Sequence, residues 1–462
     1  MIQFLKISIA SIICSITIAK PIDFKLNKDE LVSISFNPIS KGSAFNLSET
    51  QAITPASTLK LLSMIYALNT LGESFTFKTK FFYSGEIKNN TLIGDLYIVG
   101  DGDPYFNHPS LINLAMALKK LRVEKVEGNL YYDNTLFAQA ESISTMGLGD
   151  QTYNPSLGAL NSEFNRLSLW TRASEVESII PGLPVKITKA QQGFFPTQNF
   201  RSSESSNESW FLKKGAKLKI REDLPVRDAS MWSAHLLNFH LNTLGIKVKS
   251  IQAKKAPSKN LNLITSLESL PLWNLVSLTM EYSNNLMAEA ITLRACAHRN
   301  VSPITIKNCA NDYIKSLGLP KDLKIFNASG LSVDNEISAK ILSELLKNHF
   351  LKAWKNHTFL SLLSYSGQSG WIRNRLASPD YNLRVYAKTG SLDFVNNIAG
   401  YIRTKSGLWY SFSVLHTQDK KRNAISQLNR KNYKVLKDQT DSWRRSSLDR
   451  VDQLLENFID NN

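Results

Sequence analysis

The run Leu61–Leu68 constrains the fold most strongly, because it would be apolar on nearly every side of a helix. A helix without a polar face cannot lie at the surface, so the run predicts a helix inside a hydrophobic core. Pro55 suits the first turn of this helix, and Gly72 is placed to end it. The sequence therefore predicts a chain built around one buried helix.

Ser57 and Lys60 lie at the start of this helix, three residues apart and therefore on one face. The hydroxyl lies at the positive end of the helix dipole, with the amine within reach. Burial should lower the pKa of Lys60, because it removes water from the charged form, and the amine can then serve as a base. A serine nucleophile needs this arrangement where no histidine activates it. Alone, S-x-x-K is a weak signal, since most instances are ordinary helix surface.

Residues 1–19 are predicted to be a signal peptide. Lys6 precedes an apolar stretch from Ile7 to Ala19 that is too short for a permanent membrane anchor. The alternative is a buried first strand. The mature chain is therefore expected to be exported to the periplasm and soluble there.

The chain carries 55 Lys and Arg residues against 39 Asp and Glu residues, a net charge of +16. Removal of Lys6 with the signal peptide leaves 16 − 1 = +15. This surplus is spread thinly, without a long basic run, so no nucleic-acid partner is expected. In an exported protein it favours anionic cell-wall polymers or a membrane surface. A length of 462 residues allows two or three domains.

Two cysteines, Cys296 and Cys309, remain once the signal peptide, which contains Cys14, has been cleaved off. In an oxidising compartment they can form a disulfide, and two free buried thiols are an equally good interpretation. The chain has no CxxC, no HExxH and no close His/Asp cluster, so no metal is expected. Gly100-x-Gly102 lacks the third glycine of a dinucleotide fingerprint, so it is interpreted as a structural turn. No cofactor is predicted.

Two further motifs lie in recognisable local structure. Ser283-Asn284-Asn285 interrupts an apolar helical pattern that extends from about 270 to 296. Lys388-Thr389-Gly390 ends a predicted strand. An ordinary helix junction and a surface tripeptide are the common explanations for such motifs taken singly.

The C-terminal part continues with a predicted strand hairpin over 398–415. A last helix is expected from about Ser446, because apolar residues recur at helical spacing from Leu448 to Ile459.

The order S-x-x-K, S-x-N, K-T-G resembles that of penicillin-binding proteins and serine β-lactamases. Ser57 and Ser283 lie 283 − 57 = 226 positions apart, which is more than a β-lactamase needs and indicates an insertion. The chain resembles the class C low-molecular-mass penicillin-binding proteins, the D-alanyl-D-alanine carboxypeptidase/endopeptidase family of the type-4 group. The resemblance covers nearly the whole mature chain. The other stretches that carry it are Gly94-Asp95-Leu96, Gly102-Asp103-Pro104, Tyr132–Phe137, Asn327–Ser332, Ala387–Leu392 and Ala399-Gly400-Tyr401.

The resemblance implies an α/β (α+β) fold with a serine β-lactamase/transpeptidase-like domain, in which an antiparallel sheet is flanked by helices. Residues 20–75 and 255–462 would form this catalytic domain. Residues 76–254 would be the inserted region and form two smaller domains, II and III.

The implied function is that of a serine DD-peptidase acting on peptidoglycan stem peptides. It would remove terminal D-alanine, cleave D-Ala–diamino acid crosslinks, or both, and β-lactams would inhibit it. A β-lactamase is one alternative, although no deacylating glutamate can be identified. The other is a non-catalytic scaffold that binds cell-wall peptide, and the presence of Ser57, Lys60 and Lys388 disfavours it.

The resemblance also implies roles for the motif residues. Ser57 would attack the penultimate carbonyl, Lys60 would take its proton, and Ser283 would relay a proton to the departing D-alanine. The backbone N–H groups of Ser57 and Ser391 would form the oxyanion hole.

Other residues would bind the substrate. Asn285 would hold its amide, and Lys388 and Thr389, next to Gly390, would meet the terminal carboxylate. Asp133 matches a family position that can face the free amine of the diamino acid, and a structural role in a turn is the alternative.

Five residues depart from the family pattern. Asn284 stands where an acid is usual, and Tyr282 where some relatives carry Lys. Ser369 replaces an Asp, Trp371 a small Thr or Ser, and Val333 an Arg. None of these changes removes a group that the mechanism requires, so they affect the expected rate and substrate preference.

Overall fold

The computed structural model describes residues 24–145, 149–172, 175–190, 193–195, 197–203, 208–321, 323–426 and 433–462. The predicted signal peptide, residues 1–19, lies outside the described residues. In the part of the chain that is described, no helix is long and apolar enough to cross a membrane.

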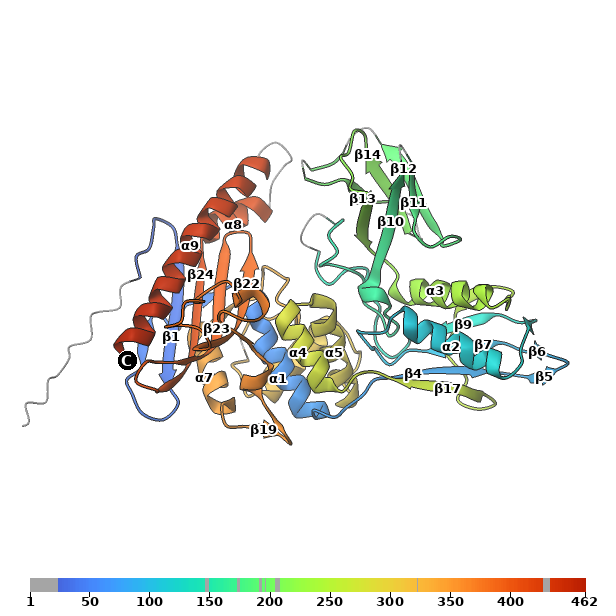
Figure 1. The fold of residues 1–462 in the computed structure, drawn as a ribbon, viewed down its shortest axis with the longest axis horizontal. Helices are drawn as coiled ribbons and strands as arrows, with labels where there is room; N and C mark the ends of the chain where they lie inside the picture. Colours follow the sequence, from blue (N-terminus) through green and yellow to red (C-terminus); the bar gives the residue numbers. More distant parts are fainter. Residues whose placement is uncertain are drawn as a thin grey trace, which may run out of the picture.

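A six-stranded antiparallel sheet forms the centre of the larger part of the molecule, in the order β2-β1-β24-β23-β22-β21 (Figure 1). Its strands are β1 (Leu31–Pro38), β2 (Phe45–Leu47), β21 (Ser364–Tyr365), β22 (Val385–Leu392), β23 (Val395–Arg403) and β24 (Trp409–Thr417). β1 pairs along its whole length with β24, so the sheet joins an early strand of the chain to a late one.

Helices cover both faces of this sheet, as Figure 1 shows. In β23, Ile398 and Ile402 pack in one core with α9 (Tyr433–Asn461), and the alternate residues Ala399 and Tyr401 pack in the other. The helices of that second core are α1 (Lys60–Leu71), α4 (Leu272–Tyr282), α5 (Asn285–His298), α6 (Ile306–Ser316) and α7 (Ala339–His349). The predicted antiparallel sheet flanked by helices is confirmed.

The buried helix predicted from the apolar run is α1. Every residue from Lys60 to Leu68 is buried, and α1 packs along α5. Gly72 ends the helix with φ +78°, and its N–H donates to Leu68 O at 3.0 Å. The start differs from the prediction, because a 3-10 turn, η1 (Ala56–Leu59), precedes α1 and contains Ser57.

The last helix begins earlier than predicted. α9 starts at Tyr433 rather than near Ser446, because its first turns are polar and give no apolar repeat. Two contacts hold this polar half against the domain instead: Lys437 Nζ lies 2.6 Å from Asp393 Oδ1, and Trp443 Nε1 donates to Glu30 Oε1 at 2.7 Å.

The inserted region begins with a five-stranded sheet in the order β16-β9-β7-β4-β17, packed against α2 (His108–Lys120) and α3 (Ala229–Thr243). The strands are β4 (Lys78–Tyr83), β7 (Leu96–Val99), β9 (Leu130–Asp133), β16 (Ile251–Ala253) and β17 (Asn262–Glu268). β17 follows the expected boundary at 254 but pairs with β4. We therefore propose that the inserted region extends to about Glu268. A smaller sheet of β5 (Glu86–Lys88), β6 (Thr91–Ile93) and β8 (Lys125–Val126) lies at its outer end (Figure 1).

A second group of strands lies above α3 in the view of Figure 1, at the upper right. It consists of two three-stranded sheets, β11-β10-β15 and β12-β14-β13. The strands are β10 (Arg166–Arg172), β11 (Glu175–Ser178), β12 (Val185–Ala190), β13 (Phe200–Ser202), β14 (Glu208–Lys213) and β15 (Arg221–Pro225). The inserted region thus contains two distinct groups of sheets.

Candidate active site

Ser57 lies in η1, where the backbone is strained. Hydrogen bonds from a side chain of β23 hold the residues just before it. Ala56, the residue before it, has φ +48°, in the left-handed region that non-glycine residues rarely adopt. The side-chain amide of Asn397 donates to the carbonyls of both Thr54 and Pro55 at 2.8 Å. Ser57 is only half-buried between buried neighbours, so its hydroxyl is accessible.

The Lys60 amine is fully buried among three oxygen atoms. Its Nζ donates to Asn285 Oδ1 and to the carbonyl of Ser329, both at 2.7 Å, and lies 3.0 Å from Ser57 Oγ. A neutral amine has two hydrogens and one lone pair. Because the two carbonyl oxygens accept the two hydrogens, the lone pair is left to face the Ser57 hydroxyl.

The surroundings of Lys60 favour this neutral form. Burial lowers its pKa well below the usual value, and the positive charge of Lys388 lowers it further, while Glu289 acts in the opposite direction. The amine is therefore suited to accept the Ser57 proton.

The middle motif lies between α4 and α5, as predicted. Ser283 ends α4 with φ +57°, and Asn284 caps α5 by accepting a hydrogen bond from Met287 N at 3.0 Å. Asn and Asp cap helices equally well, so the departure at Asn284 preserves this structural role. Asn285 contacts Lys60 through its oxygen and donates from Nδ2 to the carbonyl of Tyr153 at 2.9 Å.

Lys388 and Thr389 lie on β22 beside η1. Burial lowers the pKa of Lys388 to about 7. Among the described residues, the only hydrogen bond of its amine is to the carbonyl of Thr389, at 2.8 Å. Since one buried ammonium needs more than one acceptor, Lys388 is available to an anionic ligand.

Gly390 allows β22 to approach the backbone of Ser57 closely. It pairs with Asn397 of β23, and a Cβ at this position would lie 2.7 Å from Pro55 O and 3.0 Å from Ser57 N. A side chain would force β22 away from η1. Ser391, the next residue of β22, is exposed.

Asp133 ends β9 and takes part in a turn. Its carboxylate is buried and accepts hydrogen bonds from Thr135 N at 2.9 Å, Thr135 Oγ1 at 2.7 Å and Ala256 N at 2.8 Å. Among the described residues, none of the hydrogen bonds of Asp133 reaches the group around Ser57. The structure thus brings together the three motifs, and the described hydrogen bonds of Asp133 serve its own turn and Ala256.

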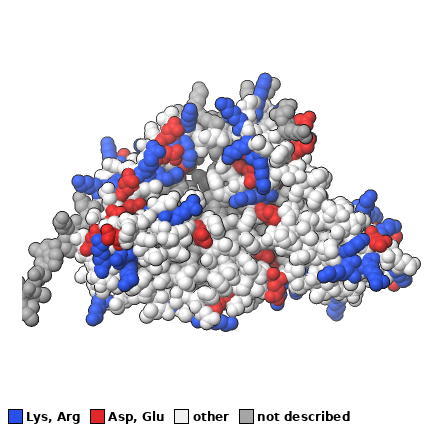
Figure 2. Space-filling view, in the orientation of Figure 1, with Lys and Arg blue, Asp and Glu red and all other residues white. Residues whose placement is uncertain are grey.

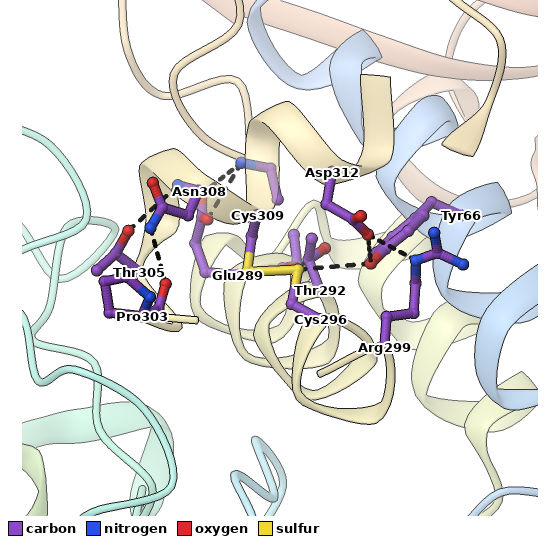
Figure 3. Close-up of a disulfide and its surroundings, with 12 residues drawn as sticks. Tyr66, Glu289, Thr292, Cys296, Arg299, Pro303, Thr305, Asn308, Cys309 and Asp312 are labelled. Carbon is purple, nitrogen blue, oxygen red and sulfur yellow. Dashed lines mark hydrogen bonds and ion pairs between the residues drawn. A yellow bond between two sulfur atoms is a disulfide. The ribbon is translucent and has the colours of Figure 1, made fainter. Parts of the chain in front are cut away.

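Cys296 of α5 and Cys309 of α6 are joined in a disulfide, with their Cα atoms 5.7 Å apart (Figure 3). Of the two alternatives left open by the sequence, the structure has the bonded one. Tyr66 of α1 packs beside it and donates to Asp312 Oδ2 at 2.7 Å, and Arg299 Nε lies at the same distance from that oxygen. The disulfide therefore ties α6 to the helix that begins with Asn285.

Two of the departures lie at the surface. Tyr282, next to Ser283, is 64% exposed. Trp371 is 68% exposed and lies in the 3-10 turn η4 (Gly370–Ile372), which packs against α4. Ser369 accepts a hydrogen bond from Tyr365 N at 3.1 Å, and so serves the local turn.

Four residues of the site have no role in the sequence-based interpretation: Tyr153, Glu289, Ser329 and Asn397. Glu289 carries a usable signal, because it is a charged residue within the apolar stretch Leu286–Ile291. Tyr153 and Ser329 contribute backbone carbonyls, which no side-chain pattern can reveal.

The cluster consists of the Ser57 hydroxyl, the amines of Lys60 and Lys388, and the side-chain amide of Asn285. Such a set can carry out nucleophilic attack by the hydroxyl with an amine as base. In the described ranges, no group of three or more His, Cys, Asp or Glu side chains is arranged to hold a metal ion.

Comparison with known proteins identifies relatives along most of the chain. Residues 37–435 match the model of the "D-Ala-D-Ala carboxypeptidase 3 (S13) family". The chain is 27% identical over 398 residues to D-alanyl-D-alanine carboxypeptidase DacB of Haemophilus influenzae, with 79% of each protein covered. It is 23% identical over 389 residues to a D-alanyl-D-alanine carboxypeptidase of Actinomadura sp., with 77% of this chain and 72% of the relative covered.

Solved structures share the fold. The crystal structure of penicillin binding protein 4 (dacB) from Haemophilus influenzae matches with a TM-score of 0.77 and 21% identity, over 92% of this chain and 97% of that chain. A penicillin G-acylated predatory endopeptidase from Bdellovibrio bacteriovorus matches with a TM-score of 0.51 and 18% identity, over 92% and 93% of the two chains.

Proposed function

Because the chain belongs to the D-Ala-D-Ala carboxypeptidase 3 (S13) family, we propose that it is a serine DD-peptidase whose acyl-enzyme forms on Ser57. The substrate is a peptidoglycan stem peptide that ends in D-Ala-D-Ala, or a crosslink in which the second D-Ala is replaced by a diamino acid. The observation that carries the proposal is the position of Lys60 Nζ, 3.0 Å from Ser57 Oγ and 2.7 Å from each of two carbonyl oxygens that can accept the hydrogens of the neutral amine.

In the acylation step, Ser57 Oγ attacks the carbonyl carbon of the penultimate D-Ala, and Lys60 Nζ takes the hydroxyl proton. The carbonyl oxygen becomes an oxyanion held by the N–H groups of Ser57 and Ser391, an arrangement worth about 3–4 kcal/mol per donor. The bond to the leaving amine then breaks, and Ser283 relays the proton that the amine needs. Water hydrolyses the ester and regenerates the hydroxyl.

Substrate binding uses the charge of Lys388. Its protonated amine and the Thr389 hydroxyl meet the terminal carboxylate, which supplies the acceptors that the buried ammonium lacks. The Asn285 amide, already oriented by Lys60 and the Tyr153 carbonyl, binds the peptide amide.

For Asp133 we propose the structural role. Its carboxylate already accepts three hydrogen bonds from Thr135 and Ala256. Recognition of the diamino acid by Asp133 would require these bonds to be shared with the ligand amine.

Intact-protein mass after incubation with benzylpenicillin tests the nucleophile. We expect a stable adduct on the wild type and none on Ser57→Ala, because the tethered leaving group of a β-lactam keeps the ester from turning over. Digests of crosslinked muropeptides then separate carboxypeptidase from endopeptidase activity.

Two other outcomes would support the alternatives. Rapid loss of the drug without an adduct would indicate a β-lactamase. An intact drug without an adduct would indicate a scaffold that binds wall peptide without turnover.

We also propose that the protein is exported to the periplasm and associates with anionic wall or membrane surfaces through its net charge of +16, or +15 without Lys6. Figure 2 shows Lys and Arg over α9 and both groups of inserted sheets, with acidic residues interspersed. Such an interaction is screened by salt, so about 1 M salt should release the protein from isolated envelopes. Retention at high salt would contradict an electrostatic association.

A further inference from the structure

We propose that Glu289 is a positioning residue that holds Lys60 in place for proton transfer from Ser57, both through the turn Asn327–Ser332 and through its charge. The inference rests on the proposed function and concerns a residue outside the three motifs.

Glu289 is a buried carboxylate on α5, only 1% exposed. Its Oε1 accepts hydrogen bonds from Ala328 N at 3.1 Å and Ser329 N at 2.8 Å, and its Oε2 accepts from Ala328 N at 3.1 Å. The carboxylate therefore fixes two successive peptide groups of the turn. Hydrogen bonds to an ionised acceptor are about twice as strong as neutral ones.

The turn carries this constraint to Lys60. Ser329 donates its N–H to Glu289 and accepts the Lys60 amine on its own carbonyl at 2.7 Å. One residue thus connects the carboxylate to the base. The turn also lies against η1, because a Cβ at Gly330 would clash with the carbonyl of Ala56.

The position of Glu289 on α5 explains why this carboxylate matters. Asn285 and Glu289 are four residues apart and lie on one face of the helix. Asn285 accepts one hydrogen bond from Lys60 directly. The carbonyl of Ser329 accepts another, and Glu289 holds Ser329 in place through its N–H. Both partners that direct the Lys60 lone pair toward Ser57 are therefore set by α5.

The charge of Glu289 acts on the same amine. The ionisable groups packed around it are Lys60 of α1 and Tyr313 of α6, whose hydroxyl donates to Asn327 O at 2.9 Å, with Lys388 of β22 beyond Lys60. The pKa of Glu289 is raised, because the effect of burial exceeds that of its hydrogen bonds and of Lys60, which lower it. Glu289 in turn raises the pKa of Lys60 against burial and Lys388. With Glu289 ionised and Lys388 protonated, a neutral Lys60 leaves this buried group without net charge.

The inserted region offers a matched control. Glu208 is also fully buried, and its carboxylate also accepts from two successive backbone N–H groups, Arg227 N at 2.7 Å and Asp228 N at 3.2 Å. Glu208→Gln removes a buried charge of the same kind without touching Lys60.

The test is the pH profile of the rate constant for acylation by a fluorescent penicillin, measured for the wild type, Glu289→Gln, Glu289→Asp and Glu208→Gln. Glu289→Gln keeps the shape and removes the charge, so the pKa of Lys60 should fall. The acid limb should then move to lower pH, with a plateau about 10- to 100-fold lower because the base is weaker and less well placed. Glu289→Asp keeps the charge and withdraws the hydrogen bonds, so the plateau should fall without that movement. Glu208→Gln should match the wild type.

Each outcome decides the proposal. A wild-type profile in folded Glu289→Gln would overturn it, and so would an equal movement of the limb in Glu208→Gln. Should the glutamate variants fail to fold, Ser329→Ala removes only a hydroxyl that stabilises the Glu289 charge, and a smaller movement in the same direction is expected. An unchanged limb there would contradict the role. A wild type that no penicillin acylates would instead contradict the proposed function.

Discussion

Two buried lysines approach the same serine from different parts of the fold, and their surroundings differ. Lys60, at the start of α1, has three oxygen partners and a carboxylate nearby, and its pKa is depressed most strongly. Lys388, in β22, has one carbonyl partner and a pKa of about 7. On this difference we base the proposed roles: Lys60, whose amine is held by two carbonyl oxygens, as the neutral base, and Lys388, whose amine has one carbonyl partner, as the cation that binds an anion.

The largest effect should come from removing the base. Lys60→Ala leaves Ser57 without a proton acceptor, so acylation by benzylpenicillin should slow by about 10²- to 10⁴-fold, measured as adduct mass against time. Lys388→Ala should slow it by only about 10- to 100-fold, the value of hydrogen bonds to a charged group. Equal losses in the two variants would mean that the two lysines share the base role.

The pH dependence of binding should sharpen the same comparison. In the proposed role Lys388 would bind the substrate carboxylate only when protonated, and burial lowers its pKa to about 7. As pH rises through 7 the free enzyme loses this charge, so kcat/KM for a D-Ala-D-Ala peptide should fall, mainly through a higher KM. Bound carboxylate raises the pKa of Lys388, so kcat should fall only at higher pH.

Steady-state kinetics between pH 5 and about 9 would check this assignment. Lys388→Arg keeps its charge throughout this range and is the control that should remove the alkaline limb. An alkaline limb that survives in Lys388→Arg would belong to another group.

Much of the fold could be predicted because its strongest signals are local. The apolar run after Lys60 indicates a buried helix regardless of its partners, and the spacing of the motifs indicates an insertion. The predicted family is confirmed by the match over residues 37–435. The first half of α9 could not be predicted, because contacts such as Trp443 with Glu30 stabilise it rather than an apolar repeat.

The site was predictable where side-chain chemistry identifies the role. Ser57, Lys60 and Asn285 are indicated by residue type and spacing, and they lie in contact. The carbonyls of Ser329 and Tyr153 were out of reach, since any residue supplies a carbonyl and only the tertiary fold decides which one faces the amine.

The smallest effect on catalysis should come from removing the disulfide. Cys296 and Cys309 are 13 residues apart, and closing a loop of this length stabilises a fold by about 3 kcal/mol. Replacing both with Ser should lower the midpoint of urea unfolding, measured by far-UV circular dichroism. The acylation rate should change by less than about threefold, because Asn285 and Glu289 lie on the opposite half of α5 from Cys296 and keep their own hydrogen bonds. A loss of acylation as large as that of Lys388→Ala, at unchanged stability, would mean that α6 positions the buried amines as well.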